Sequence, residues 1–329
     1  MRYIDVFHGD ADGICALHQL RLVEPVPAGA QLQLVSGLKR EIDLLTEVTG
    51  GPDCAVTVLD VSLERNRDHL VRLLARGAWV RYFDHHFAEA IPVHPRLHAV
   101  IEEAPDVCTS ILVDRHIGGR HRAWAVVGAF GDNLHAVARS LAASLDLREG
   151  QLDTLRALGE VLNYNAYGET AADVMIEPVD LYKALHRHAD PFEFAATPLV
   201  RQMLARSRED LSTALGVAPV LQTRHCAVFR LPNTPWAARV IGSFANTLAH
   251  GHPRRAHAVL RERGDGTFTV SVRAPLAEPH GADRLCRHYA SGGGRAAAAG
   301  IDRLDATQLD AFVHMFSEAR WEAAATLSD

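Results

Sequence analysis

Cysteine is scarce and dispersed in this sequence. The five cysteines of the 329-residue chain form no C-x-x-C pair and stand at Cys15, Cys54, Cys108, Cys226 and Cys286. This spacing argues against a zinc knuckle and against a disulfide framework. We expect all five to be buried, reduced thiols.

Long hydrophobic runs are also missing. The longest apolar stretch, AWAVVGAF at 123–130, is too short to span a bilayer. The N-terminus, MRYIDVFHGD, carries acids at positions 5 and 10 and has no long apolar core, so it does not resemble a signal peptide. A cytoplasmic protein without a membrane partner is therefore the expectation.

The chain has no excess of positive charge. Its formal net charge is −6, which argues against a broad basic groove for long duplex nucleic acid and against electrostatic binding to anionic lipid. A small phosphorylated ligand in a local pocket is compatible with this composition.

The length of the chain predicts two domains, because a single core rarely serves more than about 250–300 residues. In the first part, short β-rich runs alternate with segments of helical periodicity. The β-rich runs are 3–7, 32–37, 55–61, 78–84 and 97–103, and the helical segments are 13–23, 39–48 and 64–77. This alternation predicts a doubly wound α/β domain with a parallel sheet, in which ligands bind beyond the carboxyl ends of the strands.

The rest of the chain predicts a helical cover and a second domain. Residues 106–210 are expected to form helices over the sheet. The segment SREDLSTALGVAP (207–219) ends in Gly and Pro before a new β-rich run. We therefore expect a first domain at 1–205, a linker at 206–220 and a smaller α/β domain at 221–329.

Two local signals organise the second domain. Runs 256–263 and 267–274 flank Gly264-Asp265-Gly266, which predicts a β-hairpin. A last helix is expected after Asp305 as its N-cap. Its apolar residues, expected in the core, are Leu309, Phe312, Met315 and Phe316.

The first strand ends in FHGDADGICA, where ligand-type side chains occupy every second position. His8, Asp10 and Asp12 point to one face if the strand stays extended. Three uncompensated polar groups on a buried face are costly, so a bound cation is the favoured explanation. The alternative is a capped turn, with Asp12 as the N-cap of a helix that starts near Gly13.

Further carboxylates and imidazoles follow at the ends of later segments. Asp60 ends the run TVLD, the next strand delivers Asp84, His85 and His86, and Asp132 follows in GAFGDN. Oxygen and nitrogen ligands without a thiolate suit Mn²⁺, with Mg²⁺, Fe²⁺ or Co²⁺ as substitutes, whereas zinc would more often bring cysteine.

This series of motifs resembles a known superfamily. The segments H-G-D-A-D-G, V-L-D, D-H-H and G-D-N resemble the four successive motifs of the DHH phosphoesterases. That superfamily includes single-strand-specific exonucleases, oligoribonucleases of the nanoRNase type, dinucleotide phosphodiesterases and family II pyrophosphatases. SGGGRAAAAG at 291–300 resembles the glycine-rich substrate loop of the DHHA1 module, so the resemblance covers nearly the whole chain.

The resemblance implies a site that binds two Mn²⁺ ions, with Mg²⁺ or Co²⁺ as substitutes, in the cleft between the domains. One ion would be bound by His8, Asp10 and Asp60, and the other by Asp12, Asp60, His85 and Asp132. Asp60 would bridge the ions, Asp84 would fix an imidazole tautomer, and His86 would bind phosphate. The catalytic set is thus Asp60, Asp84, His85 and His86.

Two positions depart from the pattern of the family. His8 precedes the first Asp by two residues, where several branches have four, which puts direct binding of metal by His8 in question. Arg295 stands where the loop usually has His, and an arginine keeps a cationic phosphate contact. The substrate-binding set is His86, Gly292, Gly293, Gly294 and Arg295.

The implied function is hydrolysis of phosphodiester bonds in short single-stranded oligonucleotides or dinucleotides by a metal-activated water. A pyrophosphatase or exopolyphosphatase of the same superfamily is the nearest alternative, although that branch resembles S-R-K rather than G-G-G-R in its C-terminal domain. A catalytically silent nucleotide sensor is the alternative from another class. A homodimer is one option for the assembly.

Other polar clusters have plain structural interpretations. We expect HRHADPF (186–192) to be a solvated helix end and NYNAYGET (163–170) to be a turn. His135 is expected to be structural or to support the site, and Arg254, Arg255 and Arg261 are expected to be solvated.

Overall fold

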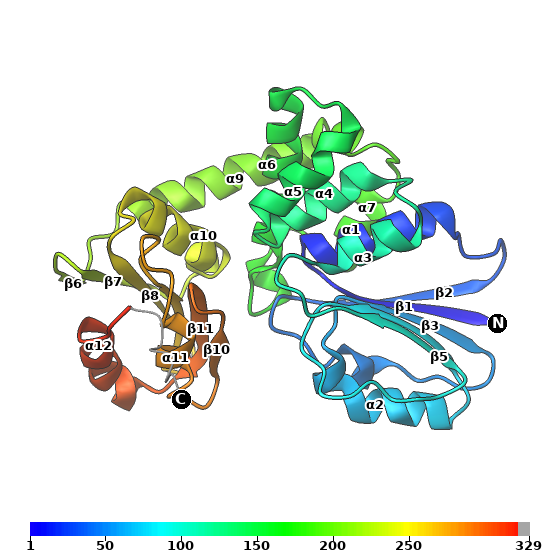
Figure 1. Cartoon of the computed structure of the whole chain (residues 1–329), viewed down its shortest axis with the longest axis horizontal. Helices are drawn as coiled ribbons and strands as arrows, with labels where there is room; N and C mark the ends of the chain where they lie inside the picture. Colours follow the sequence, from blue (N-terminus) through cyan, green and yellow to red (C-terminus); the bar gives the residue numbers. More distant parts are fainter. Residues whose placement is uncertain (322–329) are drawn as a thin grey trace, which may run out of the picture. The chain divides into compact units, whose positions relative to one another are not determined.

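The computed structural model describes residues 1–321 and separates into two compact units, with the division between Ala205 and Arg206. Helix α9 (Pro198–Leu215) runs through this division (Figure 1). The predicted linker at 206–220 is therefore helical as far as Leu215.

A five-stranded sheet with only parallel pairs forms the centre of the first unit. Its strand order is β2-β1-β3-β4-β5. The strands are β1 (Arg2–His8), β2 (Gln31–Gly37), β3 (Cys54–Leu59), β4 (Trp79–Asp84) and β5 (Leu97–Ile101). The strand order reverses between β1 and β3, and such a switch point opens a crevice at the carboxyl ends of the two strands.

Helices cover both faces of this sheet, as a doubly wound fold requires. Helices α1 (Ala11–Val23), α3 (Thr109–His116) and α7 (Pro178–Leu185) lie on one face, and α2 (Leu63–Ala75) lies on the other (Figure 1). The predicted α/β class is confirmed. The predicted helices at 13–23 and 64–77 are confirmed with small shifts of their ends.

The helix predicted at 39–48 is wrong. A carboxylate oxygen of Glu41 accepts the backbone N–H of Leu38, and the backbone N–H of Glu41 donates to the carbonyl of Leu38. This local bonding competes with helix formation, and only a short 3₁₀ turn, η1 (Leu44–Glu47), follows. The chain after β2 thus stays at the carboxyl edge of the sheet.

Further helices extend the layer that α1 begins. They are α4 (Arg122–Gly131), α5 (His135–Ala142), α6 (Glu149–Ala166) and α8 (Pro191–Ala195), with 3₁₀ turns η2 (Ala143–Leu145) and η3 (Ala171–Asp173). Helices α4 and α6 pack on α1, α5 packs on α4, and α8 packs on α6. The contact between α4 and α1 is close: a β-carbon on Gly131 would lie 2.2 Å from that of Ala11. Glycine at this position lets α4 end beside α1, which brings Asp132 to the carboxyl edge of the sheet.

Two structural interpretations are corrected in this helical layer. Residues 163–166 are the last turn of α6 rather than a free turn, and the buried Asn165 side chain bonds the backbone of Met175 and Ile176. His186 is not a solvated helix end, because its Nδ1 lies 2.9 Å from Nδ1 of the fully buried His18.

The second unit contains a six-stranded mixed sheet in the order β10-β11-β9-β8-β7-β6. Its strands are β6 (Leu221–Gln222), β7 (Cys226–Leu231), β8 (Ala256–Glu262), β9 (Phe268–Arg273), β10 (Gly292–Gly294) and β11 (Ala298–Leu304). The parallel pair β7 and β8 is joined by α10 (Pro235–Gly251). The antiparallel hairpin of β8 and β9 confirms the prediction, and Gly266 in its turn has φ +81°.

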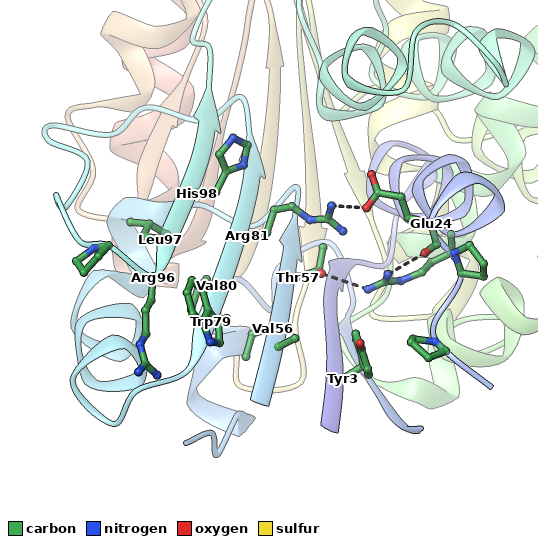
Figure 2. Close-up of a pocket in the computed structure, with 15 residues that line it drawn as sticks. Tyr3, Glu24, Val56, Thr57, Trp79, Val80, Arg81, Arg96, Leu97 and His98 are labelled. Carbon is green, nitrogen blue, oxygen red and sulfur yellow. Dashed lines mark hydrogen bonds and ion pairs between the residues drawn. The ribbon is translucent and has the colours of Figure 1, made fainter. Parts of the chain in front are cut away.

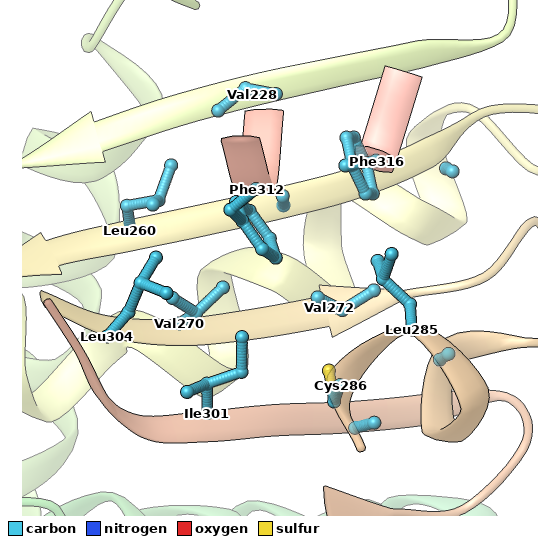
Figure 3. Close-up of a cluster of buried hydrophobic side chains, with 14 of the residues drawn as sticks. Val228, Leu260, Val270, Val272, Leu285, Cys286, Ile301, Leu304, Phe312 and Phe316 are labelled. Atoms are coloured by element: carbon cyan, nitrogen blue, oxygen red, sulfur yellow. The ribbon is translucent and has the colours of Figure 1, made fainter. Parts of the chain in front are cut away.

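Short helices complete the core of this unit. They are α11 (Ala282–Cys286) and α12 (Leu309–Ser317), and η4 (Ala306–Gln308) precedes α12. Phe312 and Phe316 of α12 reach into the apolar cluster on the sheet (Figure 3). Met315 is exposed, which corrects its predicted place in the core. Asp305 caps η4 rather than α12 itself.

The remaining structural predictions have mixed outcomes. All five cysteines are buried free thiols, as expected. Arg261 is buried, and its guanidinium contacts the hydroxyl of Thr269. The prediction that Arg261 is solvated is therefore wrong. Within residues 1–321, no helix has the length and hydropathy needed to cross a membrane.

Candidate metal centre

The turn after β1 positions the first set of polar side chains. His8 is the last residue of β1, and Asp10 is the N-cap of α1, where its Oδ1 accepts the N–H groups of Asp12 and Gly13 at 3.1 Å. Asp12 lies in the first turn of the helix. The prediction that the chain stays extended through Asp12 is therefore wrong, and the N-cap of the helix is Asp10 rather than Asp12.

The tight turn nevertheless brings His8 and Asp10 together. Nδ1 of His8 lies 3.1 Å from Oδ2 of Asp10 and 3.5 Å from Oδ2 of Asp60, and all three side chains are buried. Burial lowers the pKa of His8, but the Asp10 carboxylate, together with Asp60, outweighs it and raises that pKa to about 10. His8 is thus placed among the carboxylates despite its unusual spacing.

Asp60 sits at the switch point in a rare backbone conformation. It directly follows β3 and has φ 60°, the left-handed region that residues other than glycine seldom adopt. Its N–H donates to the carbonyl of Phe83 at 3.0 Å, and its Oδ1 accepts the hydroxyl of Thr109 at 3.2 Å. Backbone strain held in place by its surroundings is typical of functional sites.

The end of β4 turns its two histidines in different directions. Nε2 of His85 lies 3.4 Å from Oδ1 of Asp60, and its Nδ1 lies 3.0 Å from the carbonyl of Val107. Nδ1 of His86 lies 2.6 Å from Oδ1 of the buried Asp84. Asp84 also accepts the N–H of Leu63 and those of both histidines, so it fixes the whole D-H-H turn.

Two groups of possible ligands meet at one carboxylate. In the group of His8, Asp10 and Asp60, and in the group of Asp60, His85 and His86, one ligand atom from each residue lies within 4.8 Å of the others. Asp60 is therefore the residue that the two groups share.

Asp12 and Asp132 lie close by without joining either group. The Asp12 oxygens accept the N–H groups of Thr109 and Ser110, each at 2.7 Å. Burial and the Asp60 charge raise the pKa of Asp12 to about 7. Burial also raises the pKa of Asp132, against the opposing charge of Lys39.

Unpartnered polar atoms at this centre match what a bound cation would satisfy. Nε2 of His8 and Oδ2 of Asp132 are buried and have no hydrogen-bond partner among residues 1–321. Buried polar atoms usually have a partner, and a missing ion is one recognised reason when they do not. With oxygen and imidazole donors and no thiolate, the residues fit a hard or borderline divalent metal.

Lys39 is a site residue that sequence reasoning missed. Its ammonium contacts Oδ2 of Asp10. Burial raises the pKa of Asp10, but the charges of Lys39 and His8 outweigh it, and that pKa falls well below its usual range. The signal was its place just after β2, because polar residues beyond a strand's carboxyl end face the crevice.

A cavity of about 260 Å³ opens onto this centre. Its lining comprises His8, Asp10, Lys39, Glu41, Ile42, Asp60, Val61, Ser62, Arg65, His85, His86 and Asp132. A larger cavity of about 400 Å³ lies over the first halves of β3, β4 and β5 (Figure 2). There Arg81 pairs with Glu24 and Arg21 pairs with Asp5, so these two arginines already have carboxylate partners. Arg96, which also lines this cavity, bonds the Gly77 carbonyl and lies over the Trp79 ring.

The predicted substrate glycines lie in the second unit and form an edge strand rather than an open loop. Gly292, Gly293 and Gly294 make up β10 and pair with β11. Arg295 closes the turn to Ala298 through backbone hydrogen bonds of 2.9 and 3.1 Å, and its side chain is exposed. His135, in contrast, packs on Phe130 and pairs with Asn133.

Comparison with known proteins gives no match to a protein-family model and none to a curated protein. Solved structures do match. A DHH-domain protein described as a member of a family of ribosomal proteins superposes with a TM-score of 0.67 at 13% identity, over 98% of this chain and 87% of its own. The chain has the DHH fold.

Two further DHH-fold structures agree over almost the full chain. An exonuclease RecJ bound to manganese has a TM-score of 0.60 at 18% identity, with 95% of this chain and 88% of that chain covered. The pGpG-specific phosphodiesterase PggH from Vibrio cholerae has a TM-score of 0.56 at 16% identity, with 97% and 100% covered. The expected fold is confirmed.

Proposed function

We propose that this chain is a metal-dependent phosphodiesterase that hydrolyses short linear oligonucleotides or dinucleotides. The observation that carries the proposal is the position of Asp60, which belongs to two groups of possible metal ligands at the switch point of the sheet. The DHH-fold structures of an exonuclease and of a pGpG-specific phosphodiesterase support the same class of chemistry.

In this proposal His8, Asp10 and Asp60 hold one divalent ion, and Asp12, Asp60, His85 and Asp132 hold the other. Asp12 accepts hydrogen bonds from the backbone N–H groups of Thr109 and Ser110, but these do not prevent metal binding. A carboxylate has about four lone-pair positions, and the two hydrogen bonds occupy two of them. Bound Mn²⁺ ions would lower the pKa of a water and polarise the phosphoryl group. The manganese in the RecJ structure supports Mn²⁺ as the first choice.

The protein's own contribution at the phosphate comes from His86. Burial lowers the pKa of His86, but the hydrogen bond and charge of Asp84 outweigh it, and the pKa rises. With Nδ1–H donated to Asp84, a protonated ring would have its Nε2–H left to donate, and because His86 lines the cavity the acceptor would be a phosphoryl oxygen. A donor held in advance stabilises negative charge that develops there. Gly292 to Gly294 and Arg295 would bind the substrate phosphate from the second unit.

An assay of chelator-treated protein tests the proposal. We expect no hydrolysis of pApA, cyclic dinucleotides or short RNA without metal, and turnover of linear substrates after addition of Mn²⁺, Mg²⁺ or Co²⁺. Full activity in excess chelator would contradict the proposal. Cleavage of pyrophosphate or polyphosphate alone would favour the pyrophosphatase alternative, and nucleotide binding without turnover under any of these metals would favour a sensor.

A further inference from the structure

Arg65 is a cationic residue in the metal-centre cavity that has no assigned role. It lies in the first turn of α2, and its neighbours Val61 and Ser62 line the same cavity. Its backbone N–H donates to the Ser62 hydroxyl, and its side chain is exposed. Because the backbone of α2 is capped there, the base of this side chain is fixed at the cavity rim.

The other cationic groups of the cavity already face carboxylates. Lys39 contacts Asp10, and His85 faces Asp60. The Arg65 guanidinium, in contrast, makes no ion pair or hydrogen bond with any residue between 1 and 321. Arg67, two positions along the helix, pairs with Glu64 and does not line the cavity. Arg65 is therefore the cation of this cavity that is free to receive an anion.

Two donor groups on the rim come from separate elements. His86 follows β4, and Arg65 belongs to α2. A substrate with a single phosphate diester has one anionic group to offer, whereas a terminally phosphorylated dinucleotide has two. The planar guanidinium can hold two oxygens of a terminal phosphate at once, which is the geometry in which arginine exceeds lysine.

We propose that Arg65 binds a terminal phosphate of the substrate, next to the scissile one, and so makes the enzyme prefer terminally phosphorylated dinucleotides. This inference rests on the proposed phosphodiesterase function. It concerns a contact made within the first unit and is separate from the contact expected of Arg295.

Three linear dinucleotides show which terminal phosphate Arg65 would bind. They are pApA, with a 5′ phosphate, ApAp, with a 3′ phosphate, and ApA, with no terminal phosphate. With Mn²⁺ present, the wild type should have a higher kcat/KM for pApA or for ApAp than for ApA. Arg65→Ala should lower kcat/KM for the preferred phosphorylated substrate by about 10- to 100-fold, mainly through KM, and should affect ApA at least about tenfold less. Arg65→Lys should retain part of the preference.

Arg67→Ala is the matched control, since it removes an equal charge from the same helix away from the cavity. Its substrate preference should equal that of the wild type. Equal losses on all three dinucleotides in Arg65→Ala, or no loss on any, would overturn the inference, and so would a wild type without preference.

Equilibrium binding keeps this test separate from catalysis. Isothermal titration of pApA, ApAp and ApA into metal-free wild type and Arg65→Ala measures the contact without turnover. If no dinucleotide is hydrolysed but the wild type still binds pApA or ApAp more tightly than the variant does, the function proposal fails and the Arg65 contact stands. Identical binding by both proteins would overturn the contact itself.

Discussion

The Nδ1 atom of His86 lies 2.6 Å from Oδ1 of Asp84, and the Asp84 side chain is fully buried. The same oxygen accepts the backbone N–H groups of His85 and His86. A single carboxylate thus holds the turn and one imidazole of the D-H-H segment. In the proposed function Asp84 is a positioning residue, because it would act on the phosphate through His86.

Asp84→Asn is expected to slow turnover and to move the alkaline limb of the kcat profile to lower pH. Asp84 raises the pKa of His86 against the opposing effect of burial. Without that charge the ring loses its proton at lower pH, and the donor to the phosphate is lost earlier as the pH rises. Rates measured between about pH 6 and 9 check this shift.

Metal content and thermal unfolding are the controls for Asp84→Asn, because the new amide also faces the N–H of Leu63. An unchanged pH profile in a folded, metal-loaded variant would contradict the role of Asp84.

Asp60→Asn is expected to remove both metals and to lower turnover by more than about 100-fold. Asparagine adopts the left-handed conformation more readily than most residues, so the φ of 60° is retained while the charge is lost. Elemental analysis of the dialysed variant measures the metal content. Asp53→Asn, at the exposed opposite end of β3, should leave it unchanged. Normal stoichiometry in Asp60→Asn would rule out a bridging role.

The sequence predicts the strand ends of the first unit well, because a strand appears as a hydrophobic run and the polar residue after it marks the carboxyl end, where ligands bind. Both signals depend only on local pattern. Asp60 could be placed at a strand tip in this way. Its φ of 60° could not, since that conformation occurs together with a hydrogen bond to Phe83 on the neighbouring strand, which local pattern does not predict. The carboxyl edge of the sheet as the place of the site was predictable, but the backbone conformation of Asp60 at that edge was not.

Contacts between distant segments explain what sequence reasoning missed. Lys39 contacts Asp10 only because β2 pairs with β1, and sequence alone does not give that strand order. The contact between His18 and His186 joins residues 168 positions apart. The sequence around either histidine does not show that the two side chains meet.

The pair of His18 and His186 predicts that stability falls in mild acid. Burial and the neighbouring His186 lower the pKa of His18 to about 2. The unfolded chain binds this proton below about pH 6.5 and the folded chain does not, so the unfolding free energy falls as the pH falls. From pH 6.5 to 5, protonation of this group in the unfolded chain should lower the unfolding free energy by about 1.6 kcal/mol.

Denaturant unfolding of His18→Gln at these two pH values measures that contribution. The variant should lose less stability on acidification than the wild type. His98→Gln, which changes an exposed histidine on β5, should behave as the wild type does. Equal acid sensitivity of all three proteins would contradict the assignment.

Neighbouring glycines of β10 should respond differently to alanine. A β-carbon on Gly292 would lie 1.8 Å from the carbonyl oxygen of Cys286, whereas one on Gly293 would have no heavy atom within 4 Å. Gly292→Ala is therefore expected to destabilise the second unit by more than about 2 kcal/mol, and Gly293→Ala by much less. Thermal unfolding compares the two. Equal melting temperatures would mean that the backbone at Gly292 moves freely.

Arg295→Ala tests the substrate contact expected from the second unit. The turn that carries Arg295 is closed by backbone hydrogen bonds with Ala298, and the side chain is exposed, so alanine should preserve the hairpin. Loss of a charged phosphate contact should lower kcat/KM by about 30- to 1000-fold, or about 2 to 4 kcal/mol of transition-state stabilisation. Metal occupancy should stay normal, because every expected ligand belongs to the first unit.

Arg295→His sharpens this prediction through its pH dependence. An exposed histidine loses its charge as the pH rises through about 6.5, whereas arginine keeps its charge throughout. The histidine variant should therefore retain part of the activity near pH 6 and lose it progressively toward pH 8. Arg303→Ala, on the adjacent strand β11 where Arg303 pairs with Asp265, is the matched control and should leave the kinetics unchanged. Unchanged kinetics in Arg295→Ala would show that the glycine hairpin has only a structural role.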